Sequence, residues 1–244
     1  MLLRPLLPAA LALAGLVMAT PLRAAPSLQA LQDALNSSSA DALSAVLEPG
    51  DGLDPDFVAR RRLLLRQQFP DATWSVQPGA TLKDGRSTTQ ISVSGSRQEG
   101  PYRFRFEAQQ QLVLGSSGTR FNSQAVLRES SLLRSGDSDL KVSLLIPDAV
   151  LTGQRYDLDV VFDEPLEGSV VAGTIKPVSD GELLRLQTPD LQLEALGGGG
   201  IFKNAQAPYQ PGTQTWAVLL VHPKGIVAAS KLVRVVADRT ALSF

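Results

Sequence analysis

The chain has 244 residues, with 23 basic and 24 acidic side chains, one histidine and no cysteine. The lack of cysteine excludes disulfides, zinc–thiolate sites and thiol nucleophiles. Two of the basic residues and none of the acids lie in residues 1–25, so the chain beyond them has a net charge of −3. A nearly neutral protein offers no steering field for nucleic acid, and we exclude nucleic acid as a partner.

Residues 1–25 have the layout of a secretory signal peptide. One early arginine precedes an apolar run from Leu6 to Val17, and small residues follow at Ala24 and Ala25. The run is shorter than the roughly 20 residues that cross a bilayer, and an uncleaved N-terminal anchor is the alternative. We therefore expect export to the periplasm, the cell envelope or the thylakoid lumen, with no transmembrane span beyond this segment.

Helical patterns come next along the chain. Apolar residues recur at helical spacing from Ser27 to Leu47, and the polar stretch 36–39 divides them into two short helices. Asp54 and Pro55 are a capping acid and a proline at the first helical position, which predict a third helix. The residues of this helix expected to face inward are Phe57, Leu63, Leu64 and Phe69.

Three extended segments joined by turns follow the helices. In the clearest of them, Tyr102, Phe104, Phe106 and Ala108 alternate with charged and polar residues, which predicts a long, half-buried strand. Helices followed by such a meander indicate an antiparallel sheet wrapped around helices. The predicted domain spans residues 26–134.

This layout resembles the nuclear-transport-factor-two-like cone over roughly residues 27–133. The resemblance implies a pocket between helices and sheet that serves small apolar ligands, catalysis or association. Its candidate lining residues are Trp74, Tyr102, Phe104 and Phe106, for which plain core packing is the alternative explanation. The inward side of the long strand carries no acid, so the implied pocket is expected to be apolar or filled.

Residues 135–139 are interpreted as a linker, residues 140–238 as a second domain and residues 239–244 as a tail. Short strands punctuated by turn residues predict a β-sandwich, and Tyr156, Leu158, Val160 and Phe162 alternate with polar neighbours. The segments TGQRYDLDVVF, TQTWAVLLV and SKLVRVV resemble strands of an immunoglobulin-like domain that lacks the cysteine pair. The predicted fold is therefore an α+β cone-like domain followed by an all-β immunoglobulin-like sandwich.

Two further stretches, IPDAVLTGQRYDLDVVFDEPL and QAPYQPGTQTWAVLLVHP, are similar to uncharacterised exported proteins of photosynthetic bacteria. That similarity implies no activity.

No residues are nominated as catalytic, metal-binding or cofactor-binding. His222 is interpreted as a solvated turn residue. Asp157 and Asp159 are interpreted as solvated charges, because a strand spaces them by about 6–7 Å and no loop folds them around a calcium ion. The arginines at 60–62 and 66 are interpreted as a solvated helix face.

The sequence predicts an exported, non-enzymatic binding or scaffolding protein of the cell envelope. Phe202 and Tyr209, in turn-rich segments of the sandwich, are the candidate contacts for an envelope protein partner. The alternative is a small apolar ligand-binding protein that uses the pocket of the N-terminal domain. An enzyme ranks third, since no acid–base pair falls on a pocket face. Ligand, partner and oligomeric state are left open.

Overall fold

The computed structural model describes residues 26–136, 140–163, 169–187 and 189–242. The predicted signal peptide, residues 1–25, lies outside the described residues, as do positions 137–139 of the predicted linker. The helical elements are α1 (Leu28–Asn36), η1 (Ala40–Ala42), α2 (Pro55–Gln68), α3 (Asp180–Arg185) and η2 (Arg239–Ala241). The strands are β1 (Thr73–Thr81), β2 (Ser87–Glu99), β3 (Tyr102–Ser117), β4 (Arg120–Gly136), β5 (Val142–Leu145), β6 (Ala149–Leu151), β7 (Arg155–Phe162), β8 (Val171–Val178), β9 (Glu194–Leu196), β10 (Gly200–Gln206), β11 (Gly212–His222) and β12 (Gly225–Val236).

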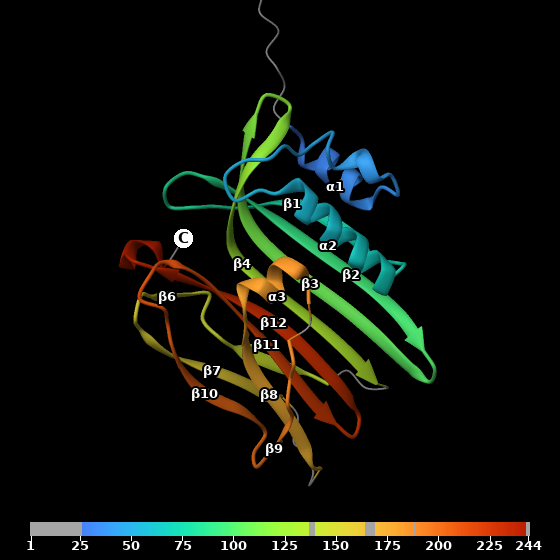
Figure 1. The fold of residues 1–244 in the computed structure, drawn as a ribbon, viewed down its shortest axis with the longest axis vertical. Coiled ribbons are helices and arrows are strands. Elements are labelled where there is room, and N and C mark those ends of the chain that lie inside the picture. Colours follow the sequence, from blue (N-terminus) through green and yellow to red (C-terminus); the bar gives the residue numbers. More distant parts are fainter. Residues whose placement is uncertain (1–25, 137–139, 164–168, 188, 243–244) are drawn as a thin grey trace, which may run out of the picture.

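A nine-stranded sheet runs through both halves of the protein (Figure 1). Its strand order is β1-β2-β3-β4-β12-β11-β8-β9, and β6 adds in parallel beside the end of β12. A second sheet has the order β10-β7-β5. The N-terminal meander is thus joined directly to the last two strands of the chain.

The predicted fold class, an α+β cone-like domain followed by an immunoglobulin-like sandwich, is wrong. Strand β4 pairs with β12 over a register that runs from Gly225 opposite Gly136 to Lys231 opposite Ser130. Main-chain hydrogen bonds therefore cross the predicted domain boundary, and the first two linker residues belong to β4. The described residues are mostly strand, and their N-terminal part forms no separate cone.

Glycine permits the close approach of β4 and β12. A Cβ on Gly225, whose φ is +154°, would lie 1.9 Å from the main-chain oxygen of Ser135. A Cβ on Gly136, whose φ is +116°, would lie 2.2 Å from the oxygen of Lys224. Any other residue at either position would push the two strands apart.

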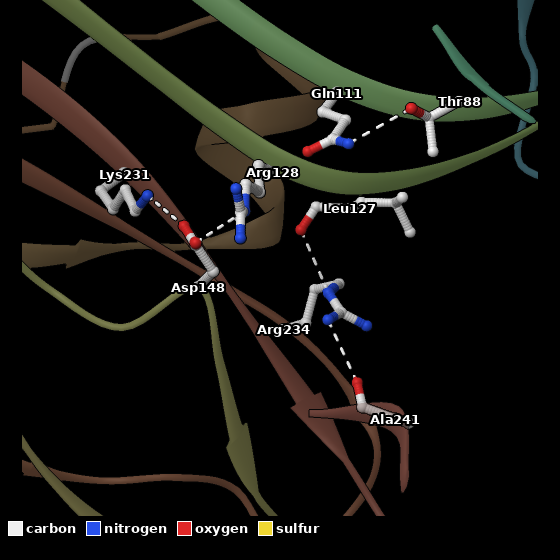
Figure 2. Close-up of polar contacts among 8 residues, drawn as sticks. All are labelled: Thr88, Gln111, Leu127, Arg128, Asp148, Lys231, Arg234 and Ala241. Carbon is white, nitrogen blue, oxygen red and sulfur yellow. Dashed lines mark hydrogen bonds and ion pairs between the residues drawn. The ribbon is translucent and has the colours of Figure 1, made fainter. Parts of the chain in front are cut away.

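Charged side chains also hold this junction (Figure 2). Asp148, in the turn before β6, accepts from Lys231 of β12 and pairs with the Arg128 Nε of β4 at 2.7 Å. Arg234 donates from Nε to the main-chain oxygen of Leu127 at 3.1 Å. Three segments far apart in the sequence therefore meet at one polar cluster.

Two apolar cores lie on opposite faces of the large sheet. In the first core, α1 and the segments around α2 pack against β1 to β4, and its buried residues include Leu31, Phe69 and Trp74. The other fills the space between the three-stranded sheet and β8, β11 and β12. The predicted alternation in β7 is confirmed, because Tyr156, Leu158, Val160 and Phe162 are all buried there.

Helix α2 begins where the sequence predicts, but the burial of two of its residues differs from the prediction. Asp54 caps the helix by accepting from the main-chain nitrogens of Asp56 and Phe57 at 3.0 and 3.1 Å. Leu63 is 56% exposed, so its predicted inward orientation is wrong. Arg62, interpreted as solvated, is buried and donates to three main-chain oxygens, those of Ala34, Ser37 and Ser39.

The same correction applies to Arg66. This side chain donates to the main-chain oxygens at the end of α1 and lies over the Trp74 ring, 5.3 Å from its centroid. Cations are favourable at the carbonyl end of a helix, which explains why α2 turns these two arginines toward α1 rather than toward water.

Candidate functional site: a cleft between α2 and α3

Helices α2 and α3 lie on one face of the large sheet (Figure 1). A cleft of about 540 Å³ lies between them. Its inner end reaches the core beneath α1. One wall comes from α2, the other from α3 and the turn after it, and the floor from β3, β4, β11 and β12. The apolar residues that line it include Leu31, Phe57, Leu64, Trp74, Phe106, Leu183, Leu186 and Leu232.

Strand alternation explains why the floor is open. On β11, Trp216 and Val218 point into the core of the two packed sheets, whereas Thr215 and Ala217 line the cleft. The same alternation on β12 turns Ser230 to the cleft. The cleft-side residues Thr215, Ala217 and Ser230 are small, so the space above this part of the floor stays open.

Several polar groups in the cleft have partners within the protein. Glu129 forms an ion pair with Arg61, and its second oxygen accepts from the Gln110 Nε2 at 2.7 Å. The negative charge of Glu129 raises the pKa of Arg61 above its ordinary value, so the guanidinium stays charged. The hydroxyls of Ser131 and Ser230 lie 2.6 Å apart across the β4–β12 pairing.

The wall formed by α3 is fixed by its own caps. Ser179 and Glu182 form a capping box, in which the Glu182 carboxylate accepts from the Ser179 main chain and hydroxyl. The hydrogen bond from the Ser179 hydroxyl lowers the pKa of Glu182. The helix ends at Leu186, the only residue other than glycine in the left-handed region within the described ranges, at φ +54°. This costly conformation carries the Leu186 side chain to the cleft wall.

Of the four aromatic residues predicted to line a pocket, two line this cleft. Trp74 lies at its inner end, and Phe106 stacks on Phe69 with centroids 5.2 Å apart. Phe104 instead lies under Arg97, 4.8 Å from the guanidinium carbon. Tyr102 is 58% exposed at the start of β3, outside the cleft lining.

The predicted partner-binding residues lie elsewhere, on β10 of the three-stranded sheet and in the loop after it. Phe202 is on β10, 67% exposed, opposite Asp159 of β7. Tyr209 is 80% exposed, and its hydroxyl accepts from the Gln206 Nε2 at 2.9 Å. The Phe202 side chain is on the side of this sheet that points away from the buried core, and Tyr209 contacts Gln206 on that side.

His222 is not the solvated turn residue that the sequence predicts. It is buried at the end of β11, with its ring 5.8 Å from that of Phe162. Its Nδ1 accepts from the main-chain nitrogen of Lys224, so the imidazole closes the hairpin turn.

Sequence reasoning missed the half of the cleft contributed by the C-terminal strands. Thr213, Thr215 and Ala217 on β11, and Ser230 on β12, are small or polar positions beside larger apolar ones, and that alternation was the available signal. Within the described residues, no group of three potential metal ligands comes together. The helices in the described part of the chain are too short or too polar to cross a membrane.

The fold and the cleft together define a mostly β protein with a cavity of ligand size on its larger sheet. A family model described as a domain of unknown function (DUF8623) matches residues 137–236. The match begins directly after β4 and ends with β12, so α2, β3 and β4 lie outside it. No curated protein sequence matches the chain. The cleft is therefore built from the matched region and the preceding residues together.

Proposed function

We propose that this is an exported, non-enzymatic binding protein whose cleft holds an elongated, uncharged apolar molecule. The observation that carries the proposal is the cleft itself. Its volume of about 540 Å³ falls within the roughly 300–1,000 Å³ typical of small-molecule sites, and its lining is mainly apolar.

The partners that the charged groups have within the protein support an uncharged ligand. Arg61 and Glu129 neutralise each other, and Glu182 serves its own helix cap. A charged ligand would have to break the Arg61–Glu129 pair before gaining a partner of its own, which leaves the other charge unpaired. The pairing also leaves Glu129 poorly placed to act as a general base, in keeping with a binding function.

Binding of N-phenyl-1-naphthylamine, an uncharged apolar dye, tests the proposal. We expect its fluorescence to rise with the wild-type protein and to saturate at one site. Leu64→Glu should weaken binding at least about tenfold, because it places a charge on a wall that is already 39% exposed and therefore tolerates the change.

Leu63→Glu is the matched control. Leu63 lies on the same helix, is 56% exposed and does not line the cleft, so this variant should bind the dye as the wild type does. Ala108→Trp, which fills the floor, should also abolish binding, whereas Ala195→Trp, at an exposed position outside the cleft, should not. Equal binding by the Leu64→Glu and Leu63→Glu variants would overturn the proposal.

A further inference from the structure

The outer face of the three-stranded sheet carries large apolar side chains in water. The register places Leu145 of β5, Asp159 of β7 and Phe202 of β10 in one row across the three strands. Leu145 is 61% exposed and Phe202 is 67% exposed. Their strand neighbours Leu144 and Ile201 pack into the core, which fixes the outward direction of this row. Leu145 and Phe202 are among the most exposed large apolar side chains of the described residues, and both point outward in one row.

Acidic charge lies between these apolar groups. Asp159 stands between Leu145 and Phe202, and Asp157, in the next outward row, accepts from the Asn204 Nδ2 at 2.7 Å. Among the ion pairs of the described residues, none involves Asp157 or Asp159. A partner that covers the row must therefore supply positive charge to Asp159, because an unpaired buried carboxylate is costly.

The same charge disfavours two other occupants of this row. A two-fold symmetric dimer centred on the row would place Asp159 of one copy against Asp159 of the other, and Arg155, outward on the same strand, lies away from that contact. An anionic membrane surface would repel these aspartates as well. The chemistry that fits is a cation flanked by two apolar groups.

The spacing of the row indicates the shape of the partner. Neighbouring strands lie about 4.8 Å apart, so Leu145 and Phe202 stand roughly 10 Å from each other. Along an α-helix, residues i and i+7 are about 10.5 Å apart, and residue i+3 or i+4 lies midway between them. We propose that the outer face of β10-β7-β5 docks a basic amphipathic helix of a partner protein, with a lysine or arginine at Asp159 and apolar residues at Leu145 and Phe202.

Tyr209 extends this surface toward the opposite end of β10. Its hydroxyl is bonded to Gln206, which points outward as Phe202 does, and its ring lies over Gly153. A longer helix would therefore reach a second aromatic contact beyond the central row.

A fluorescently labelled, alanine-based helical peptide of about 20 residues tests the proposal, a length at which such helices form in water. Leucines stand at i and i+7, with lysine at i+3 and i+4; a matched peptide carries glutamate in place of lysine. Fluorescence anisotropy should show that the lysine peptide binds and that the glutamate peptide does not. Phe202→Ser should weaken it at least about tenfold, as truncation of a central aromatic contact does. Asp159→Asn should weaken it and reduce its dependence on salt.

Three control variants carry comparable substitutions at positions outside the proposed docking face. Tyr102→Ser removes an exposed aromatic side chain, Asp84→Asn removes an exposed acid, and Leu64→Glu alters the cleft. All three should bind the lysine peptide as the wild type does. The proposal is overturned if the lysine peptide fails to bind, if the glutamate peptide binds equally well, or if Tyr102→Ser or Leu64→Glu has the effect of Phe202→Ser. A wild-type dimer that Phe202→Ser dissociates would also overturn it, since the occupant would then be a second copy.

Discussion

Asp148→Asn should destabilise the protein more than its place in a turn suggests. The carboxylate pairs with Lys231 and Arg128, and so joins β12 and β4 to the turn before β6 (Figure 2). The side chain of Lys231 is only 15% exposed and that of Asp148 is 28% exposed, whereas that of Arg128 is 52% exposed. Removing the carboxylate therefore leaves the lysine ammonium charged and mostly out of water.

The size of the effect follows from this burial. Breaking a fully buried pair from one side costs about 3–5 kcal/mol, and an exposed pair contributes about 0–1 kcal/mol. The Asp148–Lys231 pair lies between these limits, and the asparagine oxygen can still accept a hydrogen bond, so we expect a loss of about 2 kcal/mol. For a chain of this size that loss lowers the melting temperature by roughly 4–8 °C.

Urea unfolding followed by circular dichroism measures the loss. Asp84→Asn is the control, because Asp84 pairs with Arg86 on an exposed hairpin and its replacement should leave the midpoint unchanged. Adding Lys231→Met to Asp148→Asn should restore part of the lost stability, since it removes the uncompensated charge. If Asp148→Asn costs no more than Asp84→Asn, or if Lys231→Met only adds to the loss, the argument from the buried ammonium is refuted.

The remaining predictions concern three other polar contacts. Tyr156→Phe removes the acceptor of the buried Trp216 indole N–H, 2.9 Å away, and should cost about 1–3 kcal/mol in urea unfolding. Burial raises the pKa of Tyr156 above its ordinary value of 10.0, so above about pH 10 this hydroxyl ionises more readily in the unfolded chain than in the folded protein. The wild type should therefore lose stability as the pH rises above about 10, and Tyr156→Phe should lose less. Arg62→Met leaves three main-chain oxygens without a hydrogen-bond donor and should lower the melting temperature, whereas Arg62→Lys should lower it less. Ser131→Ala or Ser230→Ala alone should be less stable than the double variant, because each single change leaves one hydroxyl without its partner; additive losses would contradict this.

Local features of the chain could be predicted because they depend on neighbours in sequence. The Asp54 cap of α2 and the alternation in β7 both match the structure. In each of them, the interacting residues are a few positions apart or belong to one strand. A short stretch of sequence is therefore enough to predict each of these features.

The errors concern interactions between segments far apart in the chain. An arginine in a basic stretch of a helix, such as Arg62, is typical of a solvated face, yet the carbonyl end of α1 gives it enough acceptors to be buried. His222 follows the same logic, since the nearby Phe162 ring and the Lys224 main chain supply its contacts. A polar residue is buried when a distant segment satisfies it, and single-sequence patterns do not contain that information.

The pairing of β4 with β12 is the feature from which the cleft follows. Alternation gives a strand two faces but does not say which strand lies beside it. Once β12 lies beside β4, the small cleft-side residues of β11 and β12 continue the surface on which α2 packs, and α3 closes the far side. Two separate domains with the same strands would bury or expose those residues independently, and no cleft would result. The residues that hold this junction, Gly136, Gly225 and Asp148, therefore act on the proposed ligand site although none of them lines it.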